Sequence, residues 1–210
     1  LLDNGFPKIW SLDFLKIHNC VICSSVVLEK TILDKINNMK CVKNVLEPSC
    51  GSCEYVCELS KQYNNVNIVG IELNKTIFES IKSLESNSIT IINEDFILYD
   101  SELKYDLIIG NPPFFVMKKK DVKKSYYDYF EGRPNIFILF IIKSFSMLNE
   151  NGILSFILPK NFLNCLYYDK TRKHIGSNYE ILNIVECNDN YIETQQETIL
   201  LIVQNKKPTQ

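Results

Sequence analysis

The sequence has no apolar stretch long enough to cross a membrane. Its densest run, Ile136–Ile142, is far shorter than the roughly 18 to 20 apolar residues that a membrane helix needs. The chain begins with Leu1, and no basic segment followed by an apolar segment and a cleavage site opens it. We therefore expect no membrane partner and an intracellular protein that is not secreted, located in the cytoplasm or, in a eukaryotic or viral setting, in the nucleus or a viral factory.

The chain also lacks an excess of charge of either sign. Its 210 residues include 23 Lys and Arg against 25 Asp and Glu, which gives a formal net charge of −2. This balance excludes a protein that binds nucleic acids or membranes over its whole surface, so any such contact has to come from a local basic patch. Hydrophobic residues make up 46%, and no internal repeat or low-complexity tract occurs, which indicates one globular domain.

Metal-binding and disulfide patterns are weak, although the chain contains 8 cysteines. Cys20 and Cys23 form one CxxC pair and Cys50 and Cys53 another, but the 26 residues between the pairs exceed the usual spacing of roughly 12 to 20 in a zinc ribbon. Without a secretory context a disulfide framework is not expected either. We expect reduced thiols that pack as small hydrophobic side chains, and no metal.

Short β-branched runs alternate with helix-like stretches. Strands are predicted at 44–47, 65–73, 88–93, 105–110, 152–158, 180–186 and 198–204, and helices at 26–37, 54–63, 74–84, 135–148 and 161–175. Asn74 is expected to cap its helix, and Asn151-Gly152 to end the helix before it. The alternation predicts an α/β protein with βαβ crossovers, a mostly parallel sheet covered on both faces, and an antiparallel pair at the end. We expect an N-terminal extension at 1–23 and one domain at 24–207.

Ligands of open α/β sheets bind beyond the carboxyl ends of the strands, so the residues after each strand are the site candidates. The first strand leads into Glu47–Cys53 (EPSCGSC), a turn of small residues that lets backbone N–H groups approach a ligand. Glu72 follows the second strand 21 residues after Gly51, close to the usual offset of about 20 for a carboxylate that binds a ribose diol. Taken singly, the two features are equally consistent with a plain turn and a solvated acid.

The third and fourth strands end in residues suited to aromatic amines. Asp95 could accept a hydrogen bond from an adenine amino group while Phe96 packs on the ring; alternatively, Asp95 caps a turn and Phe96 fills the core. The fourth strand is followed by Asn111-Pro112-Pro113-Phe114. The prolines fix φ, so the Asn111 amide and the Pro112 carbonyl can converge on a planar –NH₂ group while Phe114 stacks on its ring. A simple loop terminator is the alternative, which the three neighbouring ligand-like strand ends disfavour.

These motifs, in the order LEPSCGSC, VGIEL, NEDF and YDLIIGNPPF, resemble those of S-adenosylmethionine-dependent DNA adenine-N6 methyltransferases of the gamma class, the TaqI-type modification methylases. The resemblance covers roughly residues 20 to 206. It implies a Rossmann-like class I methyltransferase fold with a seven-stranded sheet, S-adenosyl-L-methionine as cofactor and double-stranded DNA as partner. It also implies a separate recognition domain or subunit, because the catalytic domain is expected to use up this chain.

The resemblance also assigns residue roles. The implied cofactor site consists of Glu47, Pro48, Ser49, Gly51, Glu72, Asp95, Phe96, Asn111 and Phe140. Among these, the residues after the first strand would shape the methionine side, Glu72 would hold the ribose, and Asp95, Phe96 and Phe140 would hold the adenine. The implied catalytic residues are Asn111, Pro112, Pro113 and Phe114. Tyr191, or Ile192 in the alternative register, would sandwich the target base with Phe114.

Two features depart from the family pattern. Cys53 stands where the second glycine of the first loop is usual, and the N-terminal motif containing Thr-Pro is not recognisable, with Cys23-Ser24-Ser25 in about that place. Three functions therefore stay open. They are methylation of a DNA adenine, methylation of a protein glutamine or RNA base amine, and a catalytically inactive methyltransferase-like binding subunit.

A basic segment lies beside the NPPF motif. It contains the lysines Lys118, Lys119, Lys120, Lys123 and Lys124, followed by tyrosines. Lysines interleaved with aromatic residues suit phosphate contact and base packing, so we expect this segment to bind DNA. A solvated loop without a ligand is the alternative, because runs of charge usually face water.

Overall fold

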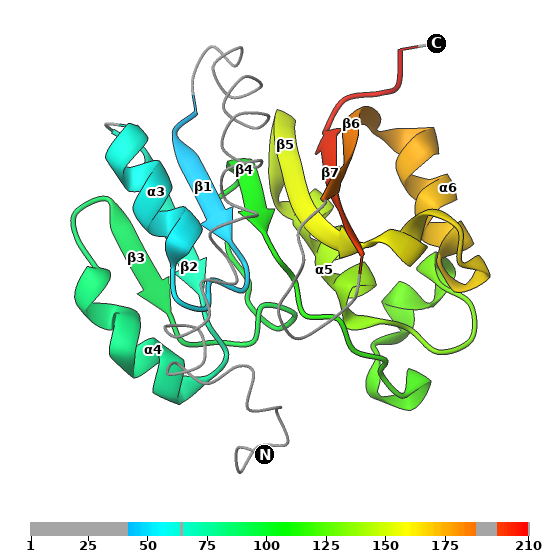
Figure 1. The fold of residues 1–210 in the computed structure, drawn as a ribbon, viewed down its shortest axis with the longest axis horizontal. Coiled ribbons are helices and arrows are strands. Elements are labelled where there is room, and N and C mark those ends of the chain that lie inside the picture. The colour runs from blue at the N-terminus through cyan, green and yellow to red at the C-terminus, as the bar shows by residue number, and fades with distance from the viewer. Residues whose placement is uncertain (1–41, 64, 188–196, 210) are drawn as a thin grey trace.

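The computed structural model describes residues 42–63, 65–187 and 197–209. They form a seven-stranded sheet with helices packed against it (Figure 1). The strands are β1 (Asn44–Glu47), β2 (Asn67–Ile71), β3 (Ile89–Ile92), β4 (Tyr105–Gly110), β5 (Leu148–Pro159), β6 (Glu180–Cys187) and β7 (Thr198–Gln204). The α-helices are α3 (Glu54–Gln62), α4 (Lys75–Ile81), α5 (Ile136–Met147) and α6 (Asp169–Asn178). Short 3-10 helices are η2 (Lys82–Leu84), η3 (Lys119–Asp121), η4 (Lys124–Tyr129), η5 (Lys160–Leu163) and η6 (Leu166–Tyr168).

The strand order across the sheet is β3-β2-β1-β4-β5-β7-β6. The pairs β1 with β2, β2 with β3, β1 with β4 and β4 with β5 are parallel, whereas β7 runs antiparallel to both β5 and β6. This confirms the expected mostly parallel sheet with one antiparallel strand from a C-terminal hairpin. The chain moves outward from β1 to β3 and then returns to place β4 on the other side of β1, so the switch point lies between β1 and β4.

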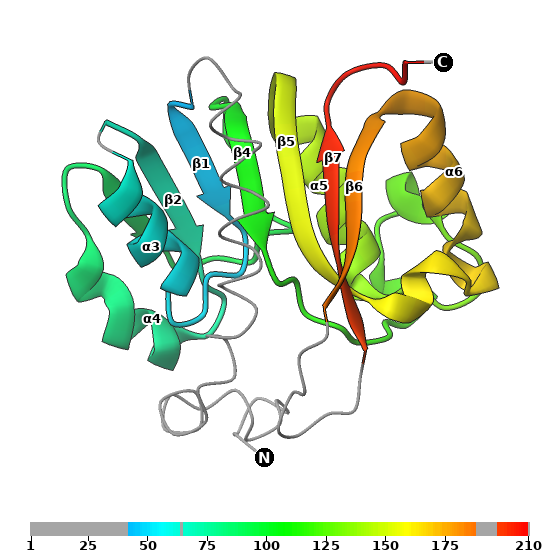
Figure 2. The ribbon, with the colours of Figure 1, turned by 45° about the horizontal axis from the view of Figure 1, so that its top comes forward.

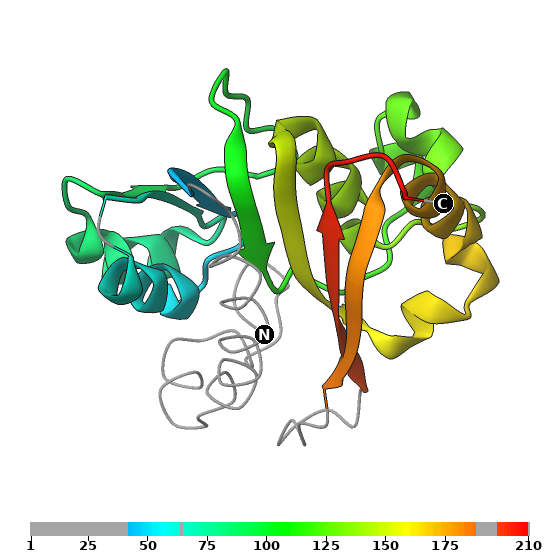
Figure 3. The ribbon, with the colours of Figure 1, turned by 90° about the horizontal axis from the view of Figure 1, so that it is seen from above.

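Each face of the sheet has its own apolar core, because successive side chains of a strand point to opposite faces. In β4, Leu107 and Ile109 pack in the core that receives Ile77 of α4, whereas Ile108 packs in the core that receives Phe137 of α5. Figure 3 looks at the molecule from above and shows α3 and α5 on opposite sides of the sheet. Figure 2 shows α6 beside β6 at the edge of the sheet.

One predicted helix boundary is wrong. The helix expected at 135–148 ends at Met147, and β5 starts at the next residue, so Asn151-Gly152 does not end it. Instead the pair lies in an irregularity of the β4–β5 pairing, where Asn151 has a φ of 63°. A Cβ on Gly152 would lie 2.9 Å from the carbonyl oxygen of Tyr105, so only glycine fits there. The error arose because Asn-Gly serves helix ends and bulges equally well.

The helix predicted at 161–175 forms only in its second part. The segment begins with η5 and η6, and α6 starts at Asp169. Between the two short helices Cys165 has an extended backbone, with φ −71° and ψ 130°. The Arg172 side chain donates to the carbonyl oxygens of Phe162 at 2.7 Å and Cys165 at 2.8 Å. A side chain thus satisfies carbonyls that a continuous helix would have used internally.

Several other expectations find their counterpart. Asn74 caps α4, since its side-chain oxygen accepts hydrogen bonds from the backbone N–H groups of Thr76 at 2.9 Å and Ile77 at 3.2 Å. The helix predicted at 26–37 and the extension expected at 1–23 lie outside the described residues. In the part of the chain that the structure describes, no helix has the length and apolarity needed to span a membrane.

The described cysteines are Cys50, Cys53, Cys57, Cys165 and Cys187, and all are free thiols. Cys50 and Cys53 are buried. Among residues 42–63, 65–187 and 197–209, no group of three or more His, Cys, Asp or Glu side chains could hold a metal ion.

Candidate functional site

The loops after the parallel strands meet at one edge of the sheet, to which the arrowheads of β1, β3 and β4 point in Figure 1. Hydrogen bonds join these loops. The Cys50 N–H donates to the Ile71 carbonyl at 2.9 Å, and the Glu72 N–H donates to the Ile92 carbonyl at 2.9 Å. The Asn93 side chain donates to the Glu72 carbonyl at 2.7 Å. The first three strand ends therefore form one connected surface.

The turn after β1 has the backbone of a glycine-rich loop. The Cys53 N–H donates to the Cys50 carbonyl at 2.7 Å, which closes a four-residue turn. Gly51 has a φ of 51° and Cys53 a φ of 64°, both in the left-handed region. Cys53 is the N-cap of α3 and is fully buried. It therefore keeps, at a steric cost, the conformation that glycine adopts freely.

Glu47 is a buried carboxyl group, 3% exposed, at the end of β1. Its Oε2 accepts a hydrogen bond of 3.2 Å from the Val56 N–H in the first turn of α3. Burial raises the pKa of Glu47 well above its ordinary value, and the nearby Cys53 and Glu54 raise this pKa further. The Val56 N–H acts in the opposite direction, because a donor stabilises the carboxylate.

Glu72 links the first two loops through both of its carboxyl oxygens. Oε2 accepts from the Gly51 N–H at 3.0 Å, and Oε1 accepts from the Asn74 N–H at 2.6 Å. Burial raises the pKa of Glu72, although the same two N–H groups lower it. An ionised carboxylate offers about four lone-pair positions, so each oxygen of Glu72 can accept a further hydrogen bond.

Asp95 and Phe96 lie in a turn after β3. The Asp95 Oδ1 accepts from the Ile97 N–H at 2.8 Å, and Phe96 is 2% exposed. The ring of Phe96 packs against that of Phe140 of α5, with a centroid distance of 4.9 Å. The structure therefore brings these three predicted residues together, and it also shows the turn-capping and core contacts of the alternative interpretation.

The NPPF motif begins directly after β4 and lies beside the first loop. The Ser49 hydroxyl donates to the Asn111 backbone carbonyl at 3.2 Å, although the two residues are 62 positions apart. The Asn111 side-chain oxygen is buried and has no hydrogen-bond partner among the described residues. Pro112 is buried, and Phe114 is half-buried with its ring 6.1 Å from that of Phe137, edge to face. The motif thus presents one unpaired amide oxygen and one fixed aromatic ring.

The predicted basic segment follows this motif and is fully on the surface. All five lysines, Lys118, Lys119, Lys120, Lys123 and Lys124, are exposed. None of them forms an ion pair with another described residue. Lys119 lies over the ring of Tyr127, 4.7 Å from its centroid, and the Tyr127 hydroxyl donates to the Lys119 carbonyl at 2.9 Å. Lys119 therefore packs against a tyrosine that follows the lysines in the chain.

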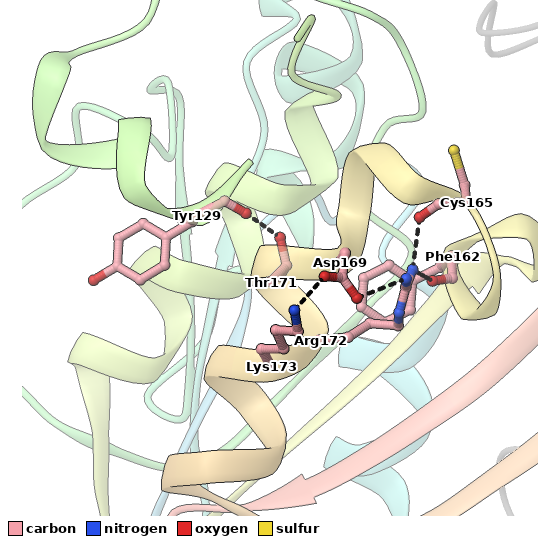
Figure 4. Close-up of polar contacts among 7 residues, drawn as sticks. All are labelled: Tyr129, Phe162, Cys165, Asp169, Thr171, Arg172 and Lys173. Carbon is pink, nitrogen blue, oxygen red and sulfur yellow. Dashed lines mark hydrogen bonds and ion pairs between the residues drawn. The ribbon is translucent and has the colours of Figure 1, made fainter. Parts of the chain in front are cut away.

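The far end of this segment is held by α6 (Figure 4). The Thr171 hydroxyl donates to the Tyr129 carbonyl at 2.6 Å. In the same view Lys173 pairs with Asp169 at 2.8 Å, and Arg172 holds the carbonyls of the η5–η6 segment. The basic segment is consequently fixed at one end by NPPF and at the other by α6.

One predicted site residue cannot be placed, and one residue near the site was not predicted. Tyr191 and its alternative Ile192 lie outside the described residues. Conversely, the half-buried Lys143 of α5 contacts the Asp95 turn and was not predicted. The available signal was that Lys143 is the one charged residue in the helix sequence IFILFIIKSFSM.

A protein family, individual relatives and solved structures all relate this chain to methyltransferases. Residues 13–192 match the family described as Eco57I restriction-modification methylase. The chain is 30% identical over 167 residues to Type II methyltransferase M.CvrRI of Paramecium bursaria Chlorella virus XZ-6E, covering 79% of this chain and 43% of that protein. It is 32% identical over 173 residues to modification methylase CviBIII of Paramecium bursaria Chlorella virus NC1A, covering 79% and 44%. The chain thus spans less than half the length of these two relatives.

Among solved structures, a Listeria monocytogenes protein described as a class I S-adenosylmethionine-dependent methyltransferase superposes with a TM-score of 0.74. The sequence identity is 19%, and the alignment covers 90% of this chain and 62% of that one. This likeness confirms the expected Rossmann-like class I methyltransferase fold. Together, fold and family confirm the expected cofactor, S-adenosylmethionine.

Proposed function

We propose, because the chain belongs to the Eco57I restriction-modification methylase family, that it transfers a methyl group from S-adenosylmethionine to the N6 amine of an adenine flipped out of DNA. The observation that carries the proposal is the buried, unpaired side-chain oxygen of Asn111 next to the rigid Pro112-Pro113 pair. A buried amide oxygen without a partner is unfavourable unless a ligand supplies the donor. An exocyclic amine supplies two such donors, one for Asn111 and one for the Pro112 carbonyl.

The first two loops fit the methionine and ribose parts of the cofactor. Glu72 is held by the Gly51 and Asn74 N–H groups and keeps lone pairs free for the two ribose hydroxyls. Glu47, Pro48, Ser49 and Gly51 would line the methionine side. The orphan oxygen of Asn111 lies at the junction of this site with that of the target, since Ser49 contacts the Asn111 backbone.

The turn after β3 fits the adenine of the cofactor. The Asp95 carboxyl can accept from an adenine amino group through its Oδ2, because the hydrogen bond from the Ile97 N–H uses Oδ1. Phe96 and Phe140 would provide apolar surface for the ring, and their own rings already touch. The proposed adenine contacts thus rest on the position of these residues in the fold as well as on the order of the motifs in the sequence.

The target adenine would lie between Asn111, Pro112 and Phe114. Its amine nitrogen is a poor nucleophile, because its lone pair is delocalised into the ring. Hydrogen bonds from both amine hydrogens to the Asn111 and Pro112 oxygens favour a more tetrahedral nitrogen and localise the lone pair. Pro113 stiffens the motif, and Phe114, held edge-on by Phe137, can stack on the flipped base.

The cofactor supplies a methyl group activated by a positively charged sulfur when it is bound. The protein contributes position and electrostatics, since direct displacement needs neither a protein nucleophile nor a metal. Water exclusion follows from stacking of the base on Phe114. Tyr191 remains the proposed second aromatic partner of the base.

The proposed substrate is double-stranded DNA, contacted through the exposed, unpaired lysines Lys118, Lys119, Lys120, Lys123 and Lys124. We also propose that sequence recognition comes from a separate domain or subunit. Its support is the size of the viral relatives, of which this chain spans less than half.

The deciding experiment is incubation of the purified chain with methyl-labelled cofactor and, separately, duplex DNA, RNA or a glutamine-containing protein. We expect label in DNA, recovered as N6-methyladenine after digestion to nucleosides. Label in RNA or protein alone would establish the competing substrate classes and overturn the proposal. Cofactor binding without any transfer would point instead to a catalytically inactive subunit.

Replacing Asn111 by alanine tests the catalytic role. We expect Asn111→Ala to lower methyl transfer by about 100- to 1,000-fold or more, because it removes one acceptor of the amine, while cofactor affinity measured by calorimetry stays nearly unchanged. Asn87→Ala, an exposed asparagine in the loop before β3, is the matched control and should transfer at the wild-type rate. Undiminished turnover of Asn111→Ala would sink the assignment.

A further inference from the structure

Helix α5 contains one charged residue in an otherwise apolar or small-polar sequence, IFILFIIKSFSM. Eight of its twelve residues are buried, and Lys143 itself is half-buried. Placing an ammonium group in such a helix is unfavourable unless the group is fully hydrogen-bonded. The position of Lys143 therefore calls for a specific set of partners.

Those partners are the end of the turn that carries Asp95 and Phe96. The Lys143 ammonium donates to the Ile97 carbonyl at 3.1 Å and also to the Tyr99 carbonyl. Within the turn, the Asp95 carbonyl accepts from the Leu98 and Tyr99 N–H groups at 2.9 and 2.8 Å. Lys143 thus binds two carbonyls of this turn, as a lysine does at the end of a helix.

The same ammonium also lies over the ring of Phe96, 5.6 Å from its centroid. This distance is within the range of about 6 Å for a cation–π contact. Phe140, one turn earlier on α5, packs against that ring at 4.9 Å. Two side chains on the same face of α5 therefore contact the ring of Phe96. Phe140 does so through its own ring and Lys143 through its charge.

Charged groups around the ammonium are of both signs. Burial lowers the pKa of Lys143, and the nearby Lys123 lowers it further. Asp100, Asp95 and Glu94 act in the opposite direction. These three acids lie in or next to the turn, and their negative charges favour the charged Lys143 ammonium beside it.

We propose that Lys143 is a positioning residue that fixes the Asp95–Tyr99 turn in the conformation that receives the adenine of S-adenosylmethionine. The proposal rests on the proposed function, because it assumes the adenine-binding role of Asp95 and Phe96. Lys143 does not touch the reacting atoms. Lys143 affects cofactor affinity, because in its absence the turn has to become ordered when the cofactor binds. The free energy of that ordering lowers the affinity.

The test compares Lys143→Met and Lys143→Arg with a matched control, Lys104→Met. Lys104 also donates to a backbone carbonyl of α5, that of Ser146 at 2.6 Å, but among the described residues it forms no hydrogen bond with the turn. Calorimetric titration with S-adenosylmethionine and with adenosine alone gives the affinities, and steady-state kinetics on DNA give KM and kcat. Urea unfolding reports whether each variant is folded.

We expect Lys143→Met to raise the dissociation constant and the KM for the cofactor by about tenfold or more, with kcat at saturation changed less than about twofold. Adenosine should lose affinity by a similar factor, because the effect is confined to the adenine end. Lys143→Arg, which keeps charge and donors, should restore most of the affinity, and Lys104→Met should behave as wild type.

Wild-type affinity in folded Lys143→Met would overturn the inference, and so would a loss of kcat with no change in KM. If Lys143→Met does not fold, Lys143→Ala removes the same donors and charge, and unchanged affinity for adenosine in that variant overturns the inference equally. Failure of the wild-type chain to bind S-adenosylmethionine or to methylate DNA would refute the proposed function instead. The two failures are therefore distinguishable.

Discussion

Glu47 makes the stability of this protein depend on pH in a direction opposite to that of most carboxyl groups. It is 3% exposed, its acidic neighbours Glu54 and Glu72 repel its charge, and among the described residues the Val56 N–H donates a hydrogen bond to it. Its pKa is therefore raised on folding, so the folded state keeps a proton that the unfolded chain has released. The contribution of Glu47 to the free energy of unfolding is largest below the ordinary glutamate pKa of about 4.3. It falls as pH rises toward the raised pKa that Glu47 has in the folded state.

The perturbation is Glu47→Gln, which keeps an oxygen for the Val56 N–H and removes the ionisation. For a single proton, the free energy of unfolding changes by up to about 1.4 kcal/mol per pH unit within that window. The new –NH₂ group can lower stability by about 1 to 3 kcal/mol if it finds no acceptor, but this penalty does not depend on pH. The informative quantity is consequently the pH dependence of the difference between the variant and the wild type.

Urea unfolding at constant ionic strength between pH 5 and pH 8 measures this difference. We expect the free energy of unfolding of Glu47→Gln to increase steadily relative to that of the wild type as pH rises. Glu79→Gln is the control, because Lys82 lowers the pKa of Glu79 and that contribution is lost only below the ordinary glutamate pKa of about 4.3, so its difference in stability from the wild type should stay constant between pH 5 and pH 8. Parallel curves for Glu47→Gln and the wild type over the whole range would refute the assignment of a raised pKa to Glu47.

Two further predictions concern the loops. Changing Lys118, Lys119, Lys120, Lys123 and Lys124 to glutamine should weaken DNA binding and reduce the slope of log K against log salt by up to about 4.5, measured by fluorescence anisotropy; an unchanged slope would contradict their role. Cys53→Gly should change the free energy of urea unfolding by less than about 1 kcal/mol, because relief of the left-handed backbone offsets the lost buried thiol. Cys53→Ala keeps the strained backbone and loses the thiol, so it should be less stable than Cys53→Gly, and the reverse order would contradict the strain at this position.

The mostly parallel sheet and the positions of its strands along the chain could be predicted from the sequence, because both follow from local patterns. β4 and β7 have the predicted bounds, and Asn74 caps α4 through two N–H groups. The alternation of strands and helices leaves few topologies, since parallel crossovers are right-handed and connections are short. The residues after each strand then fall on one edge of the sheet without further information.

The errors arose where one local signal serves two structures. Asn151-Gly152 marks either the end of a helix or a bulge, and the choice depends on the approach of the Tyr105 carbonyl, which is 46 to 47 residues away in the chain. The helix predicted from residue 161 breaks at Cys165 because the Arg172 side chain competes for its carbonyls. Both decisions are made by tertiary contacts that no local pattern contains.

Lys143 was missed for a related reason. A single lysine in an apolar helix indicates a buried partner, but the sequence does not say which carbonyls that partner offers. Its partners Ile97 and Tyr99 belong to a turn 46 and 44 residues earlier. Their proximity follows from the packing of α5 on the face of the sheet beside β4.

The switch point explains why the loop after β1 and the NPPF motif lie side by side. β1 lies between β2 and β4, so the loops after β1 and β4 leave the sheet side by side although 62 residues separate Ser49 from Asn111. The Ser49 hydroxyl therefore holds the backbone of the residue whose side-chain oxygen stays unpaired. Any displacement of the first loop is transmitted to the proposed amine-binding oxygen through this contact. Cys53, which shapes the first loop from a left-handed conformation, can consequently influence transfer as well as cofactor affinity without touching either substrate.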